Sequence, residues 1–183
     1  KSVKEALAAQ IAVIGENMNI RRFAQVKEDN GFVASYIHMG GKIGVLVDVE
    51  TDVVNDAIKE MAKNVAMQVA ALIPQYVDEA GVPAEIVEHE KKILTEQIMN
   101  DGKPANIAEK IVAGRLNKFF KEICLVDQPF VKDGDVTVKQ YTENTAKALG
   151  GDIKIVAFTR YEKGEGLEKK EDNFADEVAS MIK

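Results

Sequence analysis

The stretch PAEIVEHEKKILTEQIMNDGKPANIAEKIVAGRLNKFFKEI, residues 83–123, decides the architecture of this chain. Two runs of helical period flank a turn at residues 100–103, and a proline stands near the start of each run, where a helix loses no hydrogen bond. The first run carries Ile86, Val87, Ile93, Leu94 and Ile98, and the second carries Ile107, Ile111, Val112, Leu116 and Phe119. This pattern predicts two antiparallel helices joined along a narrow seam, a coiled-coil arm of residues 79–123.

On the N-terminal side of the arm, the apolar period changes from helical to alternating. Residues 3–14 predict a helix that Gly15 ends. Three following runs are typical of strands, at residues 20–28, 31–38 and 43–49. Asn30-Gly31 predicts a tight hairpin turn between the first two runs, because both residue types accept the positive φ that such a turn needs.

Helical period returns over residues 52–73, where Thr51 or Asp52 can cap the start and Pro74 stops the helix. After the arm, the sequence predicts a short extended piece, a helix, a strand and a last helix, at residues 128–131, 136–149, 153–161 and 172–182. We expect the strand to rejoin the first sheet. The fold class is therefore α+β, a three- to four-stranded antiparallel sheet packed on helices with the helical hairpin inserted.

The expected organisation has four parts. They are an N-terminal linking helix at 1–16, a core subdomain made of 17–78 and 124–163, the inserted arm at 79–123, and a C-terminal helical module at 164–183. The chain starts at Lys1 with a residue other than Met, which we interpret as the sign of a fragment or a processed product.

Charge and cysteine content narrow the functional classes. The formal net charge is −6, from 24 Lys and Arg against 30 Asp and Glu, which disfavours direct nucleic-acid binding because that needs clustered basic residues. Cys124 is the only cysteine and lies in an apolar run, which predicts a buried thiol in a reducing compartment. No run approaches the ~18 apolar residues of a membrane span.

Groups that could perform chemistry are sparse. The two histidines, His38 and His89, lie far apart in the sequence, so with one cysteine they predict no metal site. The glycines at 40–44 and 164–166 lack the continuation of a phosphate-binding loop and are typical of turns. We therefore expect a binding protein without catalytic residues or a cofactor, and not an enzyme.

Several motifs resemble the translation elongation factor Ts family across essentially the whole chain. They are IGENMNIRR at 14–22, GKIGVLV at 41–47, QPFV at 128–131, FTRY at 158–161 and GEGLEK at 164–169. The resemblance implies a bacterial, cytoplasmic protein that binds elongation factor Tu and promotes release of GDP. It also implies that this chain is the C-terminal two-thirds of such a factor, lacking the N-terminal domain and the first half of the core.

One motif departs from the family. The family's Thr-Asp-Phe-Val motif belongs to the missing first half, whereas Thr51-Asp52-Val53-Val54 follows a strand of the second half and lacks the Phe. The family's core has two similar halves, and we interpret these residues as the second half's counterpart of that motif and as a helix start. The chain would then carry the docking half of the factor and exchange nucleotide weakly by itself.

The resemblance also suggests a partner surface. Its candidate residues are His38, Met39, Pro129, Phe130, Val131 and Phe174. Each has a plainer alternative: residues 129–131 as a core edge strand, His38 and Met39 as a structural hairpin tip, and Phe174 as the anchor of its own helix. A different class of function is a scaffold or dimerisation module, in which the arm makes a homodimer.

Overall fold

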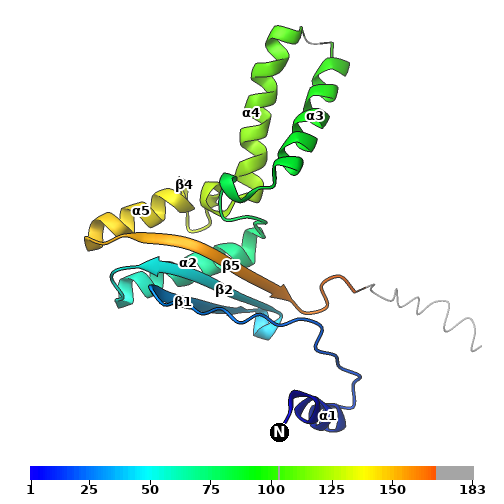
Figure 1. Cartoon of the computed structure of the whole chain (residues 1–183), viewed down its shortest axis with the longest axis vertical. Coiled ribbons are helices and arrows are strands. Elements are labelled where there is room, and N and C mark those ends of the chain that lie inside the picture. The colour runs from blue at the N-terminus through cyan, green and yellow to red at the C-terminus, as the bar shows by residue number, and fades with distance from the viewer. Residues whose placement is uncertain (103, 168–183) are drawn as a thin grey trace, which may run out of the picture.

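A three-stranded antiparallel sheet in the order β1-β2-β5 forms the centre of the molecule (Figure 1). The computed structural model describes residues 1–102 and 104–167, so the predicted helix 172–182 and Phe174 lie outside the described residues. The strands are β1 (Gly31–His38), β2 (Ile43–Thr51) and β5 (Ile153–Glu162). The helices are α1 (Val3–Ile14), α2 (Asp56–Leu72), α3 (Ala84–Asn100), α4 (Ala105–Ile123) and α5 (Val138–Leu149). The α+β prediction is confirmed.

Strand β2 is central because both of its edges are paired. Val47 lies opposite Ala34 of β1 and opposite Phe158 of β5, so the strand after the arm rejoins the first sheet as expected. The sheet among the described residues has three strands, the lower end of the predicted range. A short second ladder pairs β3 (Pro129–Phe130) with β4 (Asp133–Thr137).

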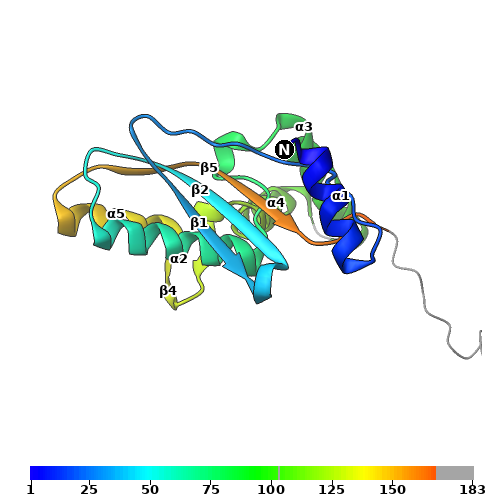
Figure 2. The same cartoon turned by 90° about the horizontal axis from the view of Figure 1, so that it is seen from below.

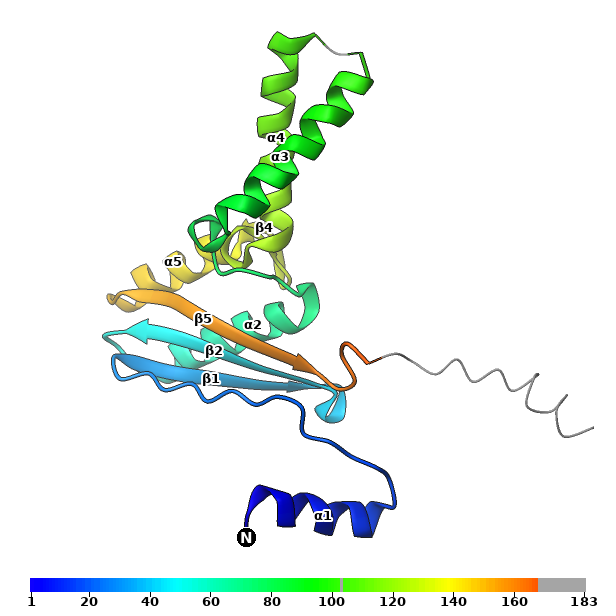
Figure 3. The same cartoon turned by 45° about the vertical axis from the view of Figure 1, so that its right-hand side comes forward.

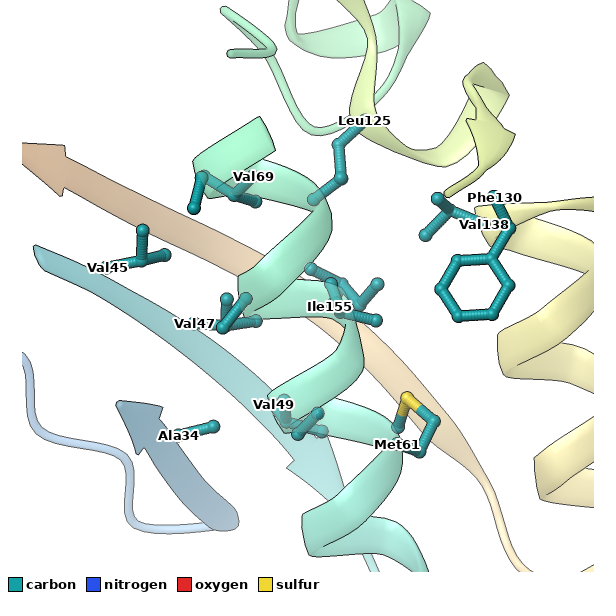
Figure 4. Packing of buried hydrophobic residues seen from close by; sticks show 14 of the residues in the cluster. Ala34, Val45, Val47, Val49, Met61, Val69, Leu125, Phe130, Val138 and Ile155 are labelled. Atoms are coloured by element: carbon teal, nitrogen blue, oxygen red, sulfur yellow. The ribbon is translucent and has the colours of Figure 1, made fainter. Parts of the chain in front are cut away.

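The main core lies between one face of the sheet and α2 (Figure 4). Alternate residues of β2 point to that face, since side chains of a strand alternate between its two sides. Val47 and Val49 meet Ile58 and Val65 of α2, and all four side chains are fully buried. Residues from beyond the arm, such as Leu125, complete this core.

Helix α2 begins four residues later than predicted. Thr51 is the last residue of β2, and its hydroxyl bonds the backbone of Val53 at 3.1 and 3.3 Å. Asp52 accepts a hydrogen bond from the backbone of Asp152, 2.9 Å away. Both predicted caps are therefore engaged elsewhere, and Asn55 caps the helix by accepting the Ile58 N–H at 3.0 Å.

The predicted strand over residues 20–28 and the hairpin turn at Asn30-Gly31 are wrong. Residues 20–28 belong to no helix and no ladder, and Gly31 is the first residue of β1. Arg22 lies 4.8 Å from the ring centroid of Tyr161 on β5, two strands away from the outer edge of β1. This segment therefore does not pair along β1. After α1 the chain passes the end of β5 and then crosses to the start of β1 (Figure 2).

The arm has the predicted form of two helices leaving the body side by side (Figure 1). Pro83 and Pro104 stand at the N-caps of α3 and α4, one position before each helix starts. The chain leaves and re-enters the body at one point, where Tyr76 and Cys124 form an isolated β-bridge. The Cys124 side chain is fully buried there, as its apolar run predicted.

Helix α1 stands apart from the sheet (Figure 3). Ser2 and Glu5 form a capping box at its start, and Gly15 ends it in the left-handed conformation with φ 78°. The helix over 3–14 is thereby confirmed. None of its residues is buried, so it makes no core with the described part of the chain.

Candidate partner-binding surface

The predicted strip Pro129, Phe130 and Val131 lies on and just after β3, with its side chains alternating between outside and inside. Phe130 is 4% exposed and stacks on Tyr141 of α5, with ring centroids 4.1 Å apart and ring planes 14° from parallel. Pro129 and Val131 are exposed. In this structure Phe130 is thus a core residue, and only Pro129 and Val131 offer apolar side chains to a partner.

The backbone of the strip is held by Gln68, in the C-terminal half of α2. Its side-chain NH2 donates to the Pro129 carbonyl at 3.0 Å, and its side-chain oxygen accepts the Val131 N–H at 2.7 Å. The Gln68 side chain is fully buried, as is most of Gln128. A buried amide is costly unless hydrogen-bonded, so these contacts stabilise the position of the strip against α2.

A second amide joins the strip to the base of the arm. Gln128 accepts from Gln68 at 3.2 Å and donates to the carbonyl of Glu122 in the last turn of α4, 2.9 Å away. Sequence reasoning missed this pair. The available signal was that Gln68 stands among the apolar residues of the helical run, one position before Val69, where a polar residue needs a buried partner.

His38 and Met39 form the tip between β1 and β2. His38 is exposed, and its Nδ1 lies 2.9 Å from the hydroxyl of Tyr36. Met39 is 60% exposed and has a φ of 49°, which is uncommon for a residue with a side chain. The hairpin tip thus presents a ring and a thioether to solvent.

The candidate residues fall into two groups. Pro129, Phe130 and Val131 are continuous in sequence and fixed on α2, whereas His38 and Met39 belong to the separate β1–β2 tip. No hydrogen bond joins the two groups in the part of the chain that the structure describes. A partner that uses both would therefore contact two separate patches.

Titratable groups near the arm base and on the sheet have shifted pKa values. Burial raises the pKa of the Cys124 thiol to about 12, so it stays protonated and unreactive at neutral pH. Burial, and then the charge of Glu28, raises the pKa of Asp48. At the end of β5, the hydrogen bond from Arg22 lowers the pKa of Glu165, and their side chains are 2.9 Å apart.

Hollows in the surface offer little for chemistry. One of about 870 Å³ at the end of the sheet is lined mainly by polar residues, among them Asp29, Glu50, Asp52, Asp152 and Lys154. It contains neither His nor Cys. Over residues 1–102 and 104–167, no group of three His, Cys, Asp or Glu side chains could hold a metal ion. Within the same ranges, no helix has the length and apolarity to span a membrane.

Comparison with known proteins gives a consistent result. The family model described as Elongation factor TS matches residues 1–165. A protein named Elongation factor Ts from Clostridioides difficile (strain 630) is 53% identical over 182 residues, covering 100% of this chain and 60% of that protein. Proteins of the same name from Clostridium botulinum (strain ATCC 19397 / Type A) and Clostridium novyi (strain NT) are 49% and 50% identical, each covered over 59% of its length. The chain spans about 60% of the length of the curated relatives it matches.

Proposed function

This chain belongs to the elongation factor Ts family, and from that premise we propose that it binds elongation factor Tu and promotes release of GDP in the bacterial cytoplasm. The family match over residues 1–165 is the observation that carries the proposal. The chain spans 60% of its relatives' length, so the activity of the whole factor is itself part of the proposal.

The mechanism is linkage between two binding equilibria. A protein that binds the nucleotide-free form of a GTPase more tightly than the GDP form weakens GDP binding by the same factor. Linkage of this kind requires the chain to make or break no covalent bond. In this proposal the chain contributes binding free energy to its complex with the nucleotide-free GTPase.

The docking surface we propose has two patches. Pro129 and Val131 project from a backbone fixed by Gln68, and His38 and Met39 project from the β1–β2 tip. Rigid, exposed apolar groups suit an interface because little conformational freedom is lost on binding. Phe130 supports the first patch from beneath by stacking on Tyr141. The role proposed for Phe174 lies outside the described residues.

The residues Thr51-Asp52-Val53-Val54 serve the fold in this proposal. Thr51 ends β2 and Asp52 fixes the backbone of Asp152. Both polar side chains bond the backbone of the chain itself, although Asp52 is exposed, and Val54 is the exposed apolar residue of the four. We therefore assign displacement of the GTPase's nucleotide to no residue of this stretch.

A second candidate is self-association through the arm. A groove of about 570 Å³ runs between α3 and α4, with Val87, Met99 and Leu116 in its lining, and Met99 is 62% exposed. An apolar groove of this kind can receive a helix from a second copy. Sedimentation over a range of concentrations tests it, and a monomer at high concentration would exclude it.

The experiment for the main proposal follows release of labelled GDP from elongation factor Tu in the presence and absence of this chain. Faster release supports exchange, and a complex that weakens as GDP is added supports docking coupled to nucleotide. Absence of any complex would overturn the proposal.

A matched pair of variants locates the docking surface. Val131→Asp places a charge on the strip and is expected to weaken the complex by roughly tenfold or more, because a charge at the centre of an apolar contact loses its hydration. Val156→Asp makes the same change on β5, where the valine is 40% exposed against 47% for Val131, and should leave binding unchanged. Equal effects of both variants would remove the strip from the interface.

A further inference from the structure

Gln68 stands out among the buried side chains, because it is a fully buried amide on the apolar face of a helix. Val65, one turn before it on the helix, and the adjacent Val69 both pack in the main core. Leaving such a group without partners would be unfavourable, and an apolar residue of similar size would fit the core pattern better. The presence of Gln at this position therefore indicates that the hydrogen bonds of its amide have a structural role.

The two hydrogen bonds between Gln68 and the strip show what this role is. The carbonyl of Pro129 and the N–H of Val131 flank Phe130 and point to the same side of the strip, as alternate residues of a strand do. One side-chain amide bonds both of them, donating at 3.0 Å and accepting at 2.7 Å. The strip pairs with β4 through Pro129 and Phe130. Gln68 thus completes the bonding of the strip as a neighbouring strand would.

We propose that Gln68 is a positioning residue for partner binding, which holds the strip so that Pro129 and Val131 face outward. This inference rests on the proposed function. With Gln68 in place, the pleat sends Phe130 inward onto Tyr141 and leaves the two flanking side chains on the surface. Without it, the strip is held on one edge only and its ordering is left to the binding event, which weakens affinity.

The same amide also ties the strip to the arm. Gln68 donates to Gln128, and Gln128 donates to the last turn of α4 at Glu122. The strip, α2 and the base of the arm are therefore connected through two side chains. A change at Gln68 is expected to loosen the strip first, because its bonds to the strip are direct and those to the arm pass through Gln128.

The test replaces Gln68 by Met, an unbranched side chain of similar length without hydrogen-bonding groups. Gln68→Met should weaken the complex with nucleotide-free elongation factor Tu by about tenfold, mainly by faster dissociation, since ordering the strip adds to the cost of the complex. Gln75→Leu is the control, because Gln75 is an exposed glutamine three residues after the end of the same helix. It should bind as the unchanged chain does.

A double-mutant cycle separates positioning from general destabilisation. If Gln68 acts through the strip, combining Gln68→Met with Val131→Ala should weaken binding by less than the product of the two single effects. Effects that multiply would mean that Gln68 supports the fold as a whole, and would overturn the inference. Unchanged affinity of Gln68→Met would overturn it as well, while binding by the unchanged chain would leave the proposed function standing.

Hydrogen exchange in the unchanged chain supplies a second test that needs no variant. The Val131 amide should be protected to about the level of the paired amides of β2, because the buried side chain of Gln68 accepts its hydrogen bond. Fast exchange at Val131 would overturn the inference even if Gln68→Met failed to fold. Failure of the unchanged chain to bind elongation factor Tu would instead overturn the proposed function and, with it, this role for Gln68.

Discussion

The body and the arm bury their apolar residues in different ways. In the body, residues of β2, α2 and β5 meet from distant parts of the sequence, and Val47, Ile58 and Val65 are completely buried. The arm has a separate cluster of Leu94, Ile98, Ala108 and Val112, all contributed by its own two helices. Burial in the body depends on long-range pairing, whereas burial in the arm depends on contacts within about forty residues.

This difference has consequences for stability. Each helix of the arm is covered along one stripe only, and its opposite face meets solvent. Regions with few buried contacts open at lower free energy than the centre of a fold. We therefore expect the arm to unfold locally while the body remains intact, and never the reverse.

The largest effect should come from the body core. Ile58→Ala removes a fully buried side chain between α2 and the sheet and should lower the free energy of unfolding by about 4 kcal/mol. Urea denaturation followed by circular dichroism measures the loss. If the body is one cooperative unit, hydrogen exchange should speed up in β1, β2, β5 and α2 together.

The matching substitution in the arm should lower stability nearly as much, but its effect should be confined to the two helices of the arm. Ile98→Ala removes a side chain that is 1% exposed within the arm cluster, at a cost of about 3 kcal/mol because the cavity can collapse more easily between two helices. Exchange should increase in α3 and α4 and stay unchanged in the sheet. Loss of protection in β2 would show that arm and body unfold as one.

Substitutions at the helix N-caps should also affect the body and the arm differently, with smaller changes in stability than the core substitutions. Asn55→Ala removes the side chain that accepts the Ile58 N–H and should destabilise the body by about 1 kcal/mol. The arm helices begin at prolines without any side-chain cap bond, so Pro104→Ala should change the stability of the arm much less. Thermal unfolding of both variants gives the comparison.

The smallest expected effect concerns a carboxyl on the sheet. Burial, and then Glu28, raises the pKa of Asp48 above its ordinary 3.8, so the ionised form disfavours folding. Asp48→Asn should therefore stabilise the body slightly at neutral pH. The gain should shrink as the pH falls through the raised pKa and vanish below the ordinary value, where the native Asp is protonated in both states. Asp101→Asn at the exposed tip of the arm is the control.

The sequence predicts those features of the structure that depend on residues close together along the chain, and it predicts less well those that depend on distant residues. The arm follows from local period and turn residues, and Gly15 marks the end of α1 correctly. The sequence pattern places the start of α2 four residues too early, because Thr51 belongs to the strand before it. Residues 20–28 have a composition compatible with a strand. A strand also needs a free sheet edge to pair with, and the local sequence pattern does not show whether such an edge lies beside the segment.

The candidate surface shows the same limit. Alternation along β3 could have separated Phe130 from Pro129 and Val131, since neighbours on a strand face opposite ways. The role of Gln68 could not be predicted, because its partners lie more than sixty residues further along the chain. A polar residue in an apolar stripe signals that a partner exists without identifying it.

The closed base of the arm affects how the chain folds. Gln75 and Leu125 bond across the base, to the carbonyls of Ile123 at 2.8 Å and Tyr76 at 2.9 Å, so the residues on either side of the arm are neighbours in space. Closing a flexible loop of about fifty residues is less favourable by roughly 2 kcal/mol than closing one of about five. A helical hairpin forms from local contacts within microseconds and brings its own ends together. By folding first, the arm, which is less stable than the body in the native molecule, shortens the search by which β5 finds β2.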